Sequence, residues 1–241
     1  FGLAGADEAD TNVWLDDWRF ARREGRYRAS LAGRELALEL TLVPTRAPML
    51  NGVAGYSQKG PDPRSASYYY SQPQLRVEGE IRRGDRRDRV TGQAWLDHEW
   101  SQAVLDADST GWDWVGINLE DGGALMAFRL RDRRGAQRWA AATLARRDGT
   151  QQVFGPDEIA WQPLRRWRSP RTGIEYPVTW NLRVGGKDYA LAPLLDDQES
   201  DSRATTGAIY WEGAVRLDGP AGMRGQGYLE LTGYGEALQL P

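Results

Sequence analysis

The chain contains no cysteine and a single histidine, His98. The lack of cysteine excludes disulfide bonds and thiol chemistry, but it leaves the cellular compartment open. With one histidine and no cysteine, a metal site is not expected, and no motif indicates a cofactor. Lysine is almost as rare, since Lys59 and Lys187 are the only two among 241 residues. The sequence also lacks a run of about 18 apolar residues, which a membrane-spanning helix would need.

Arginine therefore carries nearly all the positive charge, and it alternates with acidic residues rather than forming a basic cluster. The net charge is −3. This pattern argues against a nucleic-acid partner. Hydrophobic residues make up 40% of the chain, and 28 glycines with 11 tryptophans are typical of a turn-rich β protein.

Short segments with alternating polar and apolar residues recur along the chain, and no segment keeps a helical period. The clearest is a predicted hairpin, in which strands 111–120 and 124–131 flank a Glu-Asp-Gly-Gly turn. Other predicted strands are 26–31, 36–42, 74–81, 137–145, 179–184 and 228–233. We therefore predict an all-β fold of antiparallel barrels, because closure removes exposed strand edges. A barrel of about eight strands has room for one small ligand.

The sequence also repeats itself. Residues 75–100 align with residues 209–234, so that Glu78-Gly79 meets Glu212-Gly213 and Gly92-Gln93 meets Gly225-Gln226. Two weaker matches precede this one in the same order. The repeat predicts two tandem domains, residues 1–105 and residues 106–241.

The two copies differ in two places. The first copy contains a long Pro-, Gly- and Ser-rich loop, residues 44–73, and loops of this length are usually functional or mobile. The first copy also has no counterpart of the 111–131 hairpin, so we expect its barrel to be incomplete at its N-terminus in this chain. Upstream sequence or a partner chain would supply the missing strands.

The segment Gly92–Trp100, GQAWLDHEW, carries the candidate catalytic residues Asp97, His98 and Glu99. Strand alternation places His98 and Trp100 on the face that holds Leu229 and Leu231 in the sister copy. We therefore expect a buried His98 that bonds either to a ligand or to a backbone carbonyl or tyrosine. Asp97 aligns with Glu230, which favours a structural role such as a salt bridge over catalysis.

Aromatic residues near this segment could form the wall of a ligand site. Trp112 and Trp114 share one face of the predicted hairpin, where they either pack in the core or contact an apolar ligand. Tyr68, Tyr69 and Tyr70 predict a strand of alternating exposure that could form a pocket lip. No serine-triad, dinucleotide or phosphate-loop motif is present.

The strings GQAWLDHEW, GWDWVGINLEDGGALMAFRLRDRRG and GYLELTGY resemble the AttH-like family, which includes the carotenoid 1,2-hydratases (hydroxyneurosporene synthases). The resemblance covers essentially the whole chain. It implies two tandem lipocalin-like (calycin) barrels, a Trp-Trp-Tyr stretch before Phe1, and an apolar ligand near the interface of two barrels. It also implies a bacterial protein encoded beside an ABC-transporter permease, which slightly favours an extracytoplasmic location, periplasmic or membrane-anchored.

In the hydratases, an acid protonates a terminal isoprenoid double bond and a tertiary cation must be stabilised. The resemblance implicates His98 and Trp100 in this step. The predicted strand 124–131 has Phe128 and Leu130 where the hydratases would need polar groups, which argues against hydratase activity.

Three functions follow from these observations. The first is binding of a hydrophobic or amphipathic small molecule, such as a lipid or isoprenoid, in association with a transport system. The second is a hydratase or isomerase that acts on a carotenoid-like double bond, with Asp97, His98 and Glu99 as catalytic groups. The expected ligand-binding residues are Tyr69, Trp100, Trp112, Trp114 and Phe128. The third is an interaction module whose loop 44–73 contacts a membrane partner.

Overall fold

The computed structural model describes residues 3–101, 108–204 and 207–235. These residues form antiparallel strands and two short 3-10 helices, η1 (Pro156–Glu158) and η2 (Pro220–Gly222), with no α-helix among them. The predicted all-β fold is therefore confirmed. Within the same residues, no helix has the length and apolar character needed to cross a membrane. The predicted domain boundary at residue 105 lies outside the described residues.

The first sheet has the strand order β1-β2-β3-β4-β5-β8-β6, and β7 and β9 also pair with β8. Its strands are β1 (Ala4–Ala6), β2 (Asn12–Leu15), β3 (Trp18–Arg23), β4 (Arg26–Ala32), β5 (Leu36–Pro44), β6 (Met49–Leu50), β7 (Tyr56–Gln58), β8 (Ala66–Arg83) and β9 (Arg86–Trp100). The loop predicted for residues 44–73 thus contains two short strands and the beginning of β8, which starts earlier than predicted.

The second sheet has the order β13-β12-β11-β10-β19-β18-β16-β15-β14, with β17 paired to β18. Its strands are β10 (Gly111–Leu119), β11 (Ala124–Arg131), β12 (Gln137–Ala145), β13 (Gln151–Phe154), β14 (Ile159–Arg168), β15 (Glu175–Val184), β16 (Lys187–Pro193), β17 (Glu199–Ser202), β18 (Ala208–Asp218) and β19 (Arg224–Leu231). The predicted 111–131 hairpin is confirmed as β10–β11, in which Trp114 lies opposite Phe128.

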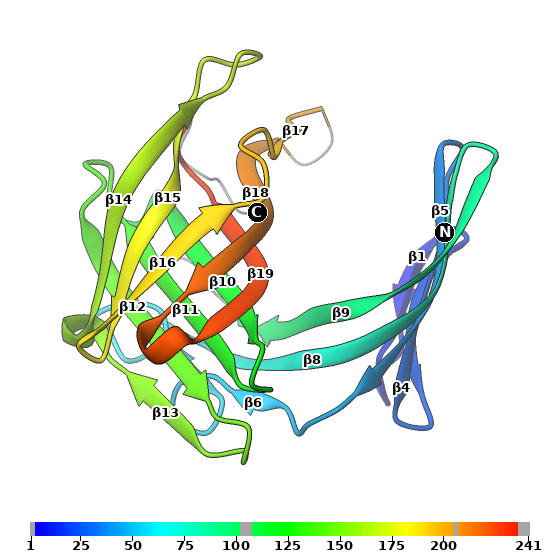
Figure 1. Ribbon diagram of the computed structural model, residues 1–241, viewed down its shortest axis with the longest axis horizontal. Coiled ribbons are helices and arrows are strands. Elements are labelled where there is room, and N and C mark those ends of the chain that lie inside the picture. The colour runs from blue at the N-terminus through cyan, green and yellow to red at the C-terminus, as the bar shows by residue number, and fades with distance from the viewer. Residues whose placement is uncertain (1–2, 102–107, 205–206, 236–241) are drawn as a thin grey trace. The chain divides into compact units, whose positions relative to one another are not determined.

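The strand order repeats between the two sheets. In the first sheet β4, β5, β8 and β9 are neighbours in that order, and in the second β15, β16, β18 and β19 follow the same order. The aligned segments of the sequence repeat, residues 75–100 and 209–234, correspond to β8–β9 and β18–β19. Both sheets curl into half-barrels of the lipocalin type (Figure 1).

Contacts divide the chain into two compact units. Unit 1 comprises Phe1–Ala47 and Gln72–Leu96, and unit 2 comprises Pro48–Ser71 and Asp97–Pro241. The long strands β8 and β9 therefore each contribute residues to both units. The bounds of the predicted tandem domains, 1–105 and 106–241, differ from those of the two compact units. The tandem domains describe the sequence repeat and stay a prediction.

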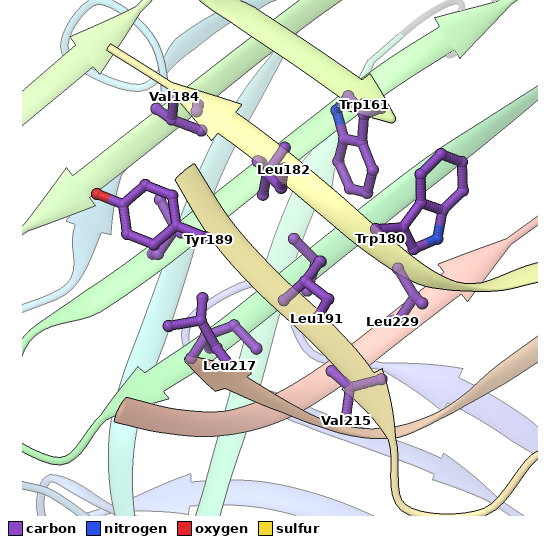
Figure 2. Close-up of a cluster of buried hydrophobic side chains, with 14 of the residues drawn as sticks. Trp161, Trp180, Leu182, Val184, Tyr189, Leu191, Val215, Leu217 and Leu229 are labelled. Carbon is purple, nitrogen blue, oxygen red and sulfur yellow. The ribbon is translucent and has the colours of Figure 1, made fainter. Parts of the chain in front are cut away.

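The core of unit 2 is filled by large side chains from the inner face of the second sheet (Figure 2). Trp180, Trp211 and Tyr176 are completely buried, and Trp180 pairs across the ladder with Leu191. Burial of each such side chain contributes roughly 1.5–3 kcal/mol. The interior of this sheet is thus packed with protein side chains.

One buried ionic cluster belongs to the same interior face. The Asp113 carboxylate is completely buried and lies 2.6 Å from Nε of Arg129 and 3.1 Å from Nε of Arg131. The Tyr234 hydroxyl donates a hydrogen bond of 2.8 Å to the other carboxylate oxygen. Because buried charges must be paired, this network ties β10 and β11 to the segment after β19.

The smaller core of unit 1 contains Tyr27, Leu42, Leu75 and Val77, with Ala94 and Leu96 of β9 packed against them. Leu96 is also the last β9 residue in unit 1. The alternation that places Ala94 and Leu96 on the core side of β9 continues to His98 and Trp100, but these residues lie beyond this core.

Candidate functional site

A cavity of about 260 Å³ in unit 2 brings together most of the predicted site residues. Its apolar wall consists of Tyr69 from β8, Trp112 and Trp114 from β10, and Phe128 and Leu130 from β11. In β10 these tryptophans alternate with the buried core residues Val115 and Ile117. The cavity therefore lies on the outer face of the second sheet. We call it the aromatic cavity.

Strand alternation explains how the wall forms. Residues at every second position point to one face of a strand, so β10 directs Asp113 and Val115 inward and both tryptophans outward. Core packing, the alternative considered for Trp112 and Trp114, does not describe these residues, since both line the cavity. The predicted alternation at Tyr68–Tyr70 is confirmed: Tyr68 is 54% exposed, whereas Tyr69 is 3% exposed and faces the cavity.

Four ionisable side chains complete the lining: Lys59, Asp97, Glu99 and Glu230. Lys59 follows β7, where its backbone N–H bonds to the carbonyl of Ser65. Asp97 and Glu99 come from the end of β9, and Glu230 from β19. Three carboxyl groups and one amine give the cavity an acidic polar lining beside its aromatic wall.

The Lys59 amine is held by several contacts at once. Its Nζ lies 2.7 Å from Oε1 of Glu99, 4.1 Å from the centre of the Phe128 ring and 4.7 Å from that of Tyr69. The lysine side chain is 7% exposed and the glutamate side chain 30%. Burial lowers the pKa of Lys59, and the charge of Glu99 offsets part of this effect.

A chain of hydrogen bonds orders the wall beside the carboxylates. Trp114 Nε1 donates to the Tyr69 hydroxyl at 2.9 Å, and Tyr69 in turn hydrogen-bonds to Asp97. The Ser71 hydroxyl donates to the same carboxylate at 2.6 Å. Burial raises the pKa of Tyr69 well above its ordinary value, so this hydroxyl keeps its proton and can act as a donor.

Glu230 is a buried acid of the cavity with a strongly shifted pKa. Burial raises its pKa to about 7, whereas a hydrogen bond from Trp112 lowers it and the nearby charges of Glu212 and Asp97 raise it. Glu212 lies directly opposite Glu230 in the β18–β19 ladder, and burial raises its pKa as well. Near neutral pH, Glu230 can therefore exist in both the protonated and the ionised form.

His98 and Trp100 lie on the other face of β9. The prediction of a buried His98 is wrong: His98 is exposed, Trp100 is 52% exposed, and neither lines the aromatic cavity. The physical reason is that β9 extends beyond the core of unit 1 after Leu96, so the residues of that core do not cover His98. His98 Nδ1 lies 3.0 Å from the Tyr70 hydroxyl. Of the expected hydrogen-bond partners, the structure therefore shows a tyrosine.

The histidine belongs to a row of exposed aromatic rings. Trp100 lies 5.1 Å from His98 and stacks on Tyr68 with 5.6 Å between ring centres. The three predicted catalytic residues are therefore separated: Asp97 and Glu99 point into the cavity, and His98 points to the opposite face of the same strand.

Comparison with known proteins assigns the family. The model of the AttH-like family matches residues 1–234. The chain belongs to the AttH-like family. It is similar to a crystal structure of a Nitrosomonas europaea protein assigned as an AttH, with a TM-score of 0.91 and 46% identity over 95% of this chain and 72% of that one. No curated protein sequence matches the chain.

Two more distant structures share the fold of this AttH-like chain. Kievitone hydratase from Nectria haematococca has a TM-score of 0.76 and 18% identity over 94% of this chain and 71% of that one. CghA with Sch210972 has a TM-score of 0.59 and 13% identity over 98% and 74%. At such identities the likeness shows the fold alone. The resemblance found in the sequence strings is confirmed at the level of the family.

Sequence reasoning missed three lining residues of this AttH-like protein as site residues: Lys59, Leu130 and Glu230. The rarity of lysine was a usable signal, because one of the two lysines sits in the long loop 44–73. The alignment of Glu230 with Asp97 was a second signal, since both acids line the cavity. In the described part of the chain, no group of three or more His, Asp or Glu side chains could hold a metal ion.

A larger cavity of about 700 Å³ also occurs in this AttH-like chain. It is lined by the ends of β12 and β16 and by the turn at Gly185, with Arg146, Arg147 and Lys187 at its edge. It contains none of the predicted site residues. The aromatic cavity is therefore the candidate functional site, because it combines an apolar wall with convergent polar groups.

Proposed function

We propose that this AttH-like protein binds a hydrophobic or amphipathic small molecule, of lipid or isoprenoid type, in the aromatic cavity. The observation that carries the proposal is the pairing of an aromatic wall with carboxyl groups in one space. Sites for such ligands are mostly apolar, with a small number of polar groups that orient the ligand. Trp112, Trp114 and Phe128 offer ring faces to an apolar chain, and Asp97 and Glu230 can accept hydrogen bonds from a hydroxyl group.

The volume limits what the cavity can hold. With about 30 Å³ for each non-hydrogen atom, as for a water molecule in the liquid, 260 Å³ accommodates roughly nine atoms. This is close to the size of a small terpenoid, or of one end of a longer isoprenoid or acyl chain. We therefore expect a long ligand to insert its polar or unsaturated end and to leave the rest outside the cavity.

Binding can be tested with geraniol, a small isoprenoid alcohol, by isothermal titration calorimetry. Trp114→Ala and Phe128→Ala should each weaken binding by at least about tenfold, since loss of roughly 1.4 kcal/mol of contact gives that factor. Trp18→Ala is the matched control, because Trp18 is a partly exposed tryptophan of unit 1. Equal affinity in all variants, or native mass spectra of the purified full-length protein without any co-purified lipid, would count against the proposal.

A second candidate function, hydration or isomerisation of an isoprenoid double bond, is favoured by Glu230. A carboxyl group with a pKa of about 7 is half protonated at neutral pH, which suits a general acid. The sequence of strand 92–100 suggested Asp97 or Glu99 for this role, but Glu230 is the group whose protonated form burial favours. Kievitone hydratase shares the fold at 18% identity, which carries no information about the reaction. The position of Glu230 in the cavity is what supports this function.

The proposed reaction begins with proton transfer and passes through a carbocation. Glu230 donates its proton to the terminal alkene carbon, and a tertiary carbocation forms at the neighbouring carbon. The ring faces of Trp112 and Trp114 stabilise this cation. A water molecule adds to the cation, and its proton passes to a carboxylate of the cavity such as Asp97. In isomerisation, a carboxylate instead removes a proton from the adjacent carbon.

The two functions are distinguished by Glu230→Gln. This variant should still bind geraniol, because the glutamine oxygen can accept the hydrogen bond that the carboxylate accepted, and it should lose incorporation of labelled oxygen from water into an acyclic isoprenoid. If the wild-type protein incorporates no label, the hydratase function is excluded and ligand binding remains. Persistent incorporation in Glu230→Gln would exclude Glu230 as the acid.

Association with an ABC-transporter permease is a further proposal, which rests on the family resemblance. Co-purification of the full-length protein with such a permease from native membranes would support it. Recovery of the protein without any membrane component would argue against it.

A further inference from the structure

Lys59 is the one amine in the aromatic cavity, among the residues that the structure describes. The chain contains a single other lysine, Lys187, which is exposed. A residue whose only role was to form an ion pair could lie at the surface and could be an arginine, as in the exposed ion pairs of this chain. A buried lysine is costly, and its presence between two aromatic rings and a carboxylate calls for a chemical explanation.

The contacts of Lys59 suit a reacting amine. Glu99 lies 2.7 Å from the nitrogen, within range to accept a proton from it and to return that proton later. The Ser67 hydroxyl donates a hydrogen bond to the same Glu99 oxygen and fixes the carboxylate in place. Phe128 and Tyr69 cover the nitrogen with their ring faces, which stabilise positive charge.

We propose that the aromatic cavity is a carbonyl site, in which Lys59 forms a reversible imine with an aldehyde or ketone carried on an apolar chain. This inference rests on the proposed binding function and names the ligand class. An arginine at this position could pair with Glu99 but could not form the imine, which accounts for a lysine in a chain that otherwise uses arginine.

The chemistry balances without any oxidant or reductant. Lys59 gives one proton to Glu99, and the neutral amine adds to the carbonyl carbon to form a carbinolamine. Glu99 returns its proton to the hydroxyl group, which leaves as water. The nitrogen and carbon are then joined by a double bond, and the protonated imine carries one positive charge beside the Glu99 carboxylate. The net reaction is amine plus carbonyl compound to imine plus water.

Two features supply the conditions that imine formation needs. Burial lowers the pKa of Lys59, so more of this amine is neutral near pH 7 than of an exposed lysine. The Lys59 side chain is only 7% exposed, so its nitrogen is shielded from bulk water, which would otherwise hydrolyse the imine. The cavity also has room for the aldehyde end and most of the chain of a small branched aldehyde such as citral, whose chain is that of geraniol.

The test is reductive trapping of the full-length protein with citral and cyanoborohydride at pH 7. The expected product is heavier by one citral molecule less one oxygen atom, and peptide mapping should place it on Lys59. Labelling of Lys59 should be at least about tenfold faster than that of Lys187, which is exposed and lies outside the aromatic cavity. Geraniol, which lacks a carbonyl, should compete and slow the labelling.

Three variants make the test decisive. Lys59→Arg should keep the fold, as judged by its melting temperature, and should bind geraniol but form no adduct. Lys59→Met provides the same comparison if arginine does not fit, and Glu99→Gln should slow trapping while geraniol still binds. Equal labelling of Lys59 and Lys187, or no labelling of Lys59 by citral that binds, overturns the imine site and leaves the binding function intact. If neither geraniol nor citral binds, the proposed function itself fails.

Discussion

Glu230 lies directly opposite Glu212 across the β18–β19 ladder, and burial raises the pKa of both carboxyl groups. Two acids in register on one face of a sheet repel each other when both are ionised. The fold accepts this cost at the wall of the aromatic cavity. Unfavourable placement of charge is common where a site needs a group with a shifted pKa.

The stability of the protein should therefore fall as the pH rises from about 4.5 to above 7. In this range the folded Glu230, with a pKa of about 7, holds a proton that the unfolded chain has released. Glu230→Gln should abolish this decline and stabilise the protein at pH 8 by up to about 3 kcal/mol, at about 1.4 kcal/mol per pKa unit. Urea unfolding at pH 5 and pH 8 measures the effect. Glu120→Gln, at an exposed position, should change neither value.

Asp113→Asn should be strongly destabilising. It removes the buried negative charge between Arg129 and Arg131, and loss of one partner from a buried ion pair costs about 3–5 kcal/mol. The control is Asp188→Asn, which breaks an exposed pair with Arg183 at 2.8 Å and should shift the urea midpoint little. Similar midpoints for both variants would show that the cluster contributes no net stability.

Tyr69→Phe should lower stability by about 1–3 kcal/mol, because it leaves Trp114 Nε1 and the Asp97 carboxylate without their shared partner. Geraniol binding should weaken as well, since the orientation of Trp114 depends on this hydrogen bond. Tyr68→Phe is the neighbouring control, at a side chain that is 54% exposed, and it should be neutral in both assays. Thermal melting and calorimetry on the same samples provide the comparison.

His98→Leu should fold normally and change stability by no more than about 0.5 kcal/mol, since His98 is exposed and its bond to Tyr70 lies at the surface. Geraniol affinity should be unchanged, whereas Asp97→Asn should alter it. A large loss of affinity in His98→Leu with intact Asp97 would place the ligand on the exposed aromatic face of β9 instead of in the cavity.

Local patterns predicted much of this fold. Period-two alternation and turn residues located the β10–β11 hairpin, and the run Tyr68–Tyr70 predicted a strand of alternating exposure, in which Tyr69 proves to be the buried residue. These features depend on residues close together in the sequence. The repeat predicted equivalent strands, and the order β15-β16-β18-β19 matches β4-β5-β8-β9.

The site was less predictable, because the side chains that β9 exposes depend on how far the core of unit 1 extends along this strand. Alternation assigned His98 correctly to the same face of β9 as Leu96, but it carries no information about how far the packed core extends along a strand. Lys59 reaches the cavity through the pairing of β7 with β8, which no local pattern specifies. The sequence therefore indicated Asp97 and Glu99 as candidates without showing that a lysine lies between them and Phe128.

The division of β8 and β9 between the two units has a consequence for experiments that dissect the gene. A fragment that begins at residue 108 retains Trp112, Trp114, Phe128 and Glu230 but lacks Lys59, Tyr69, Asp97 and Glu99. Such a fragment would keep an exposed apolar surface without its polar lining. The second repeat alone is therefore expected to be poorly soluble, and ligand-binding experiments need a chain that contains both repeats.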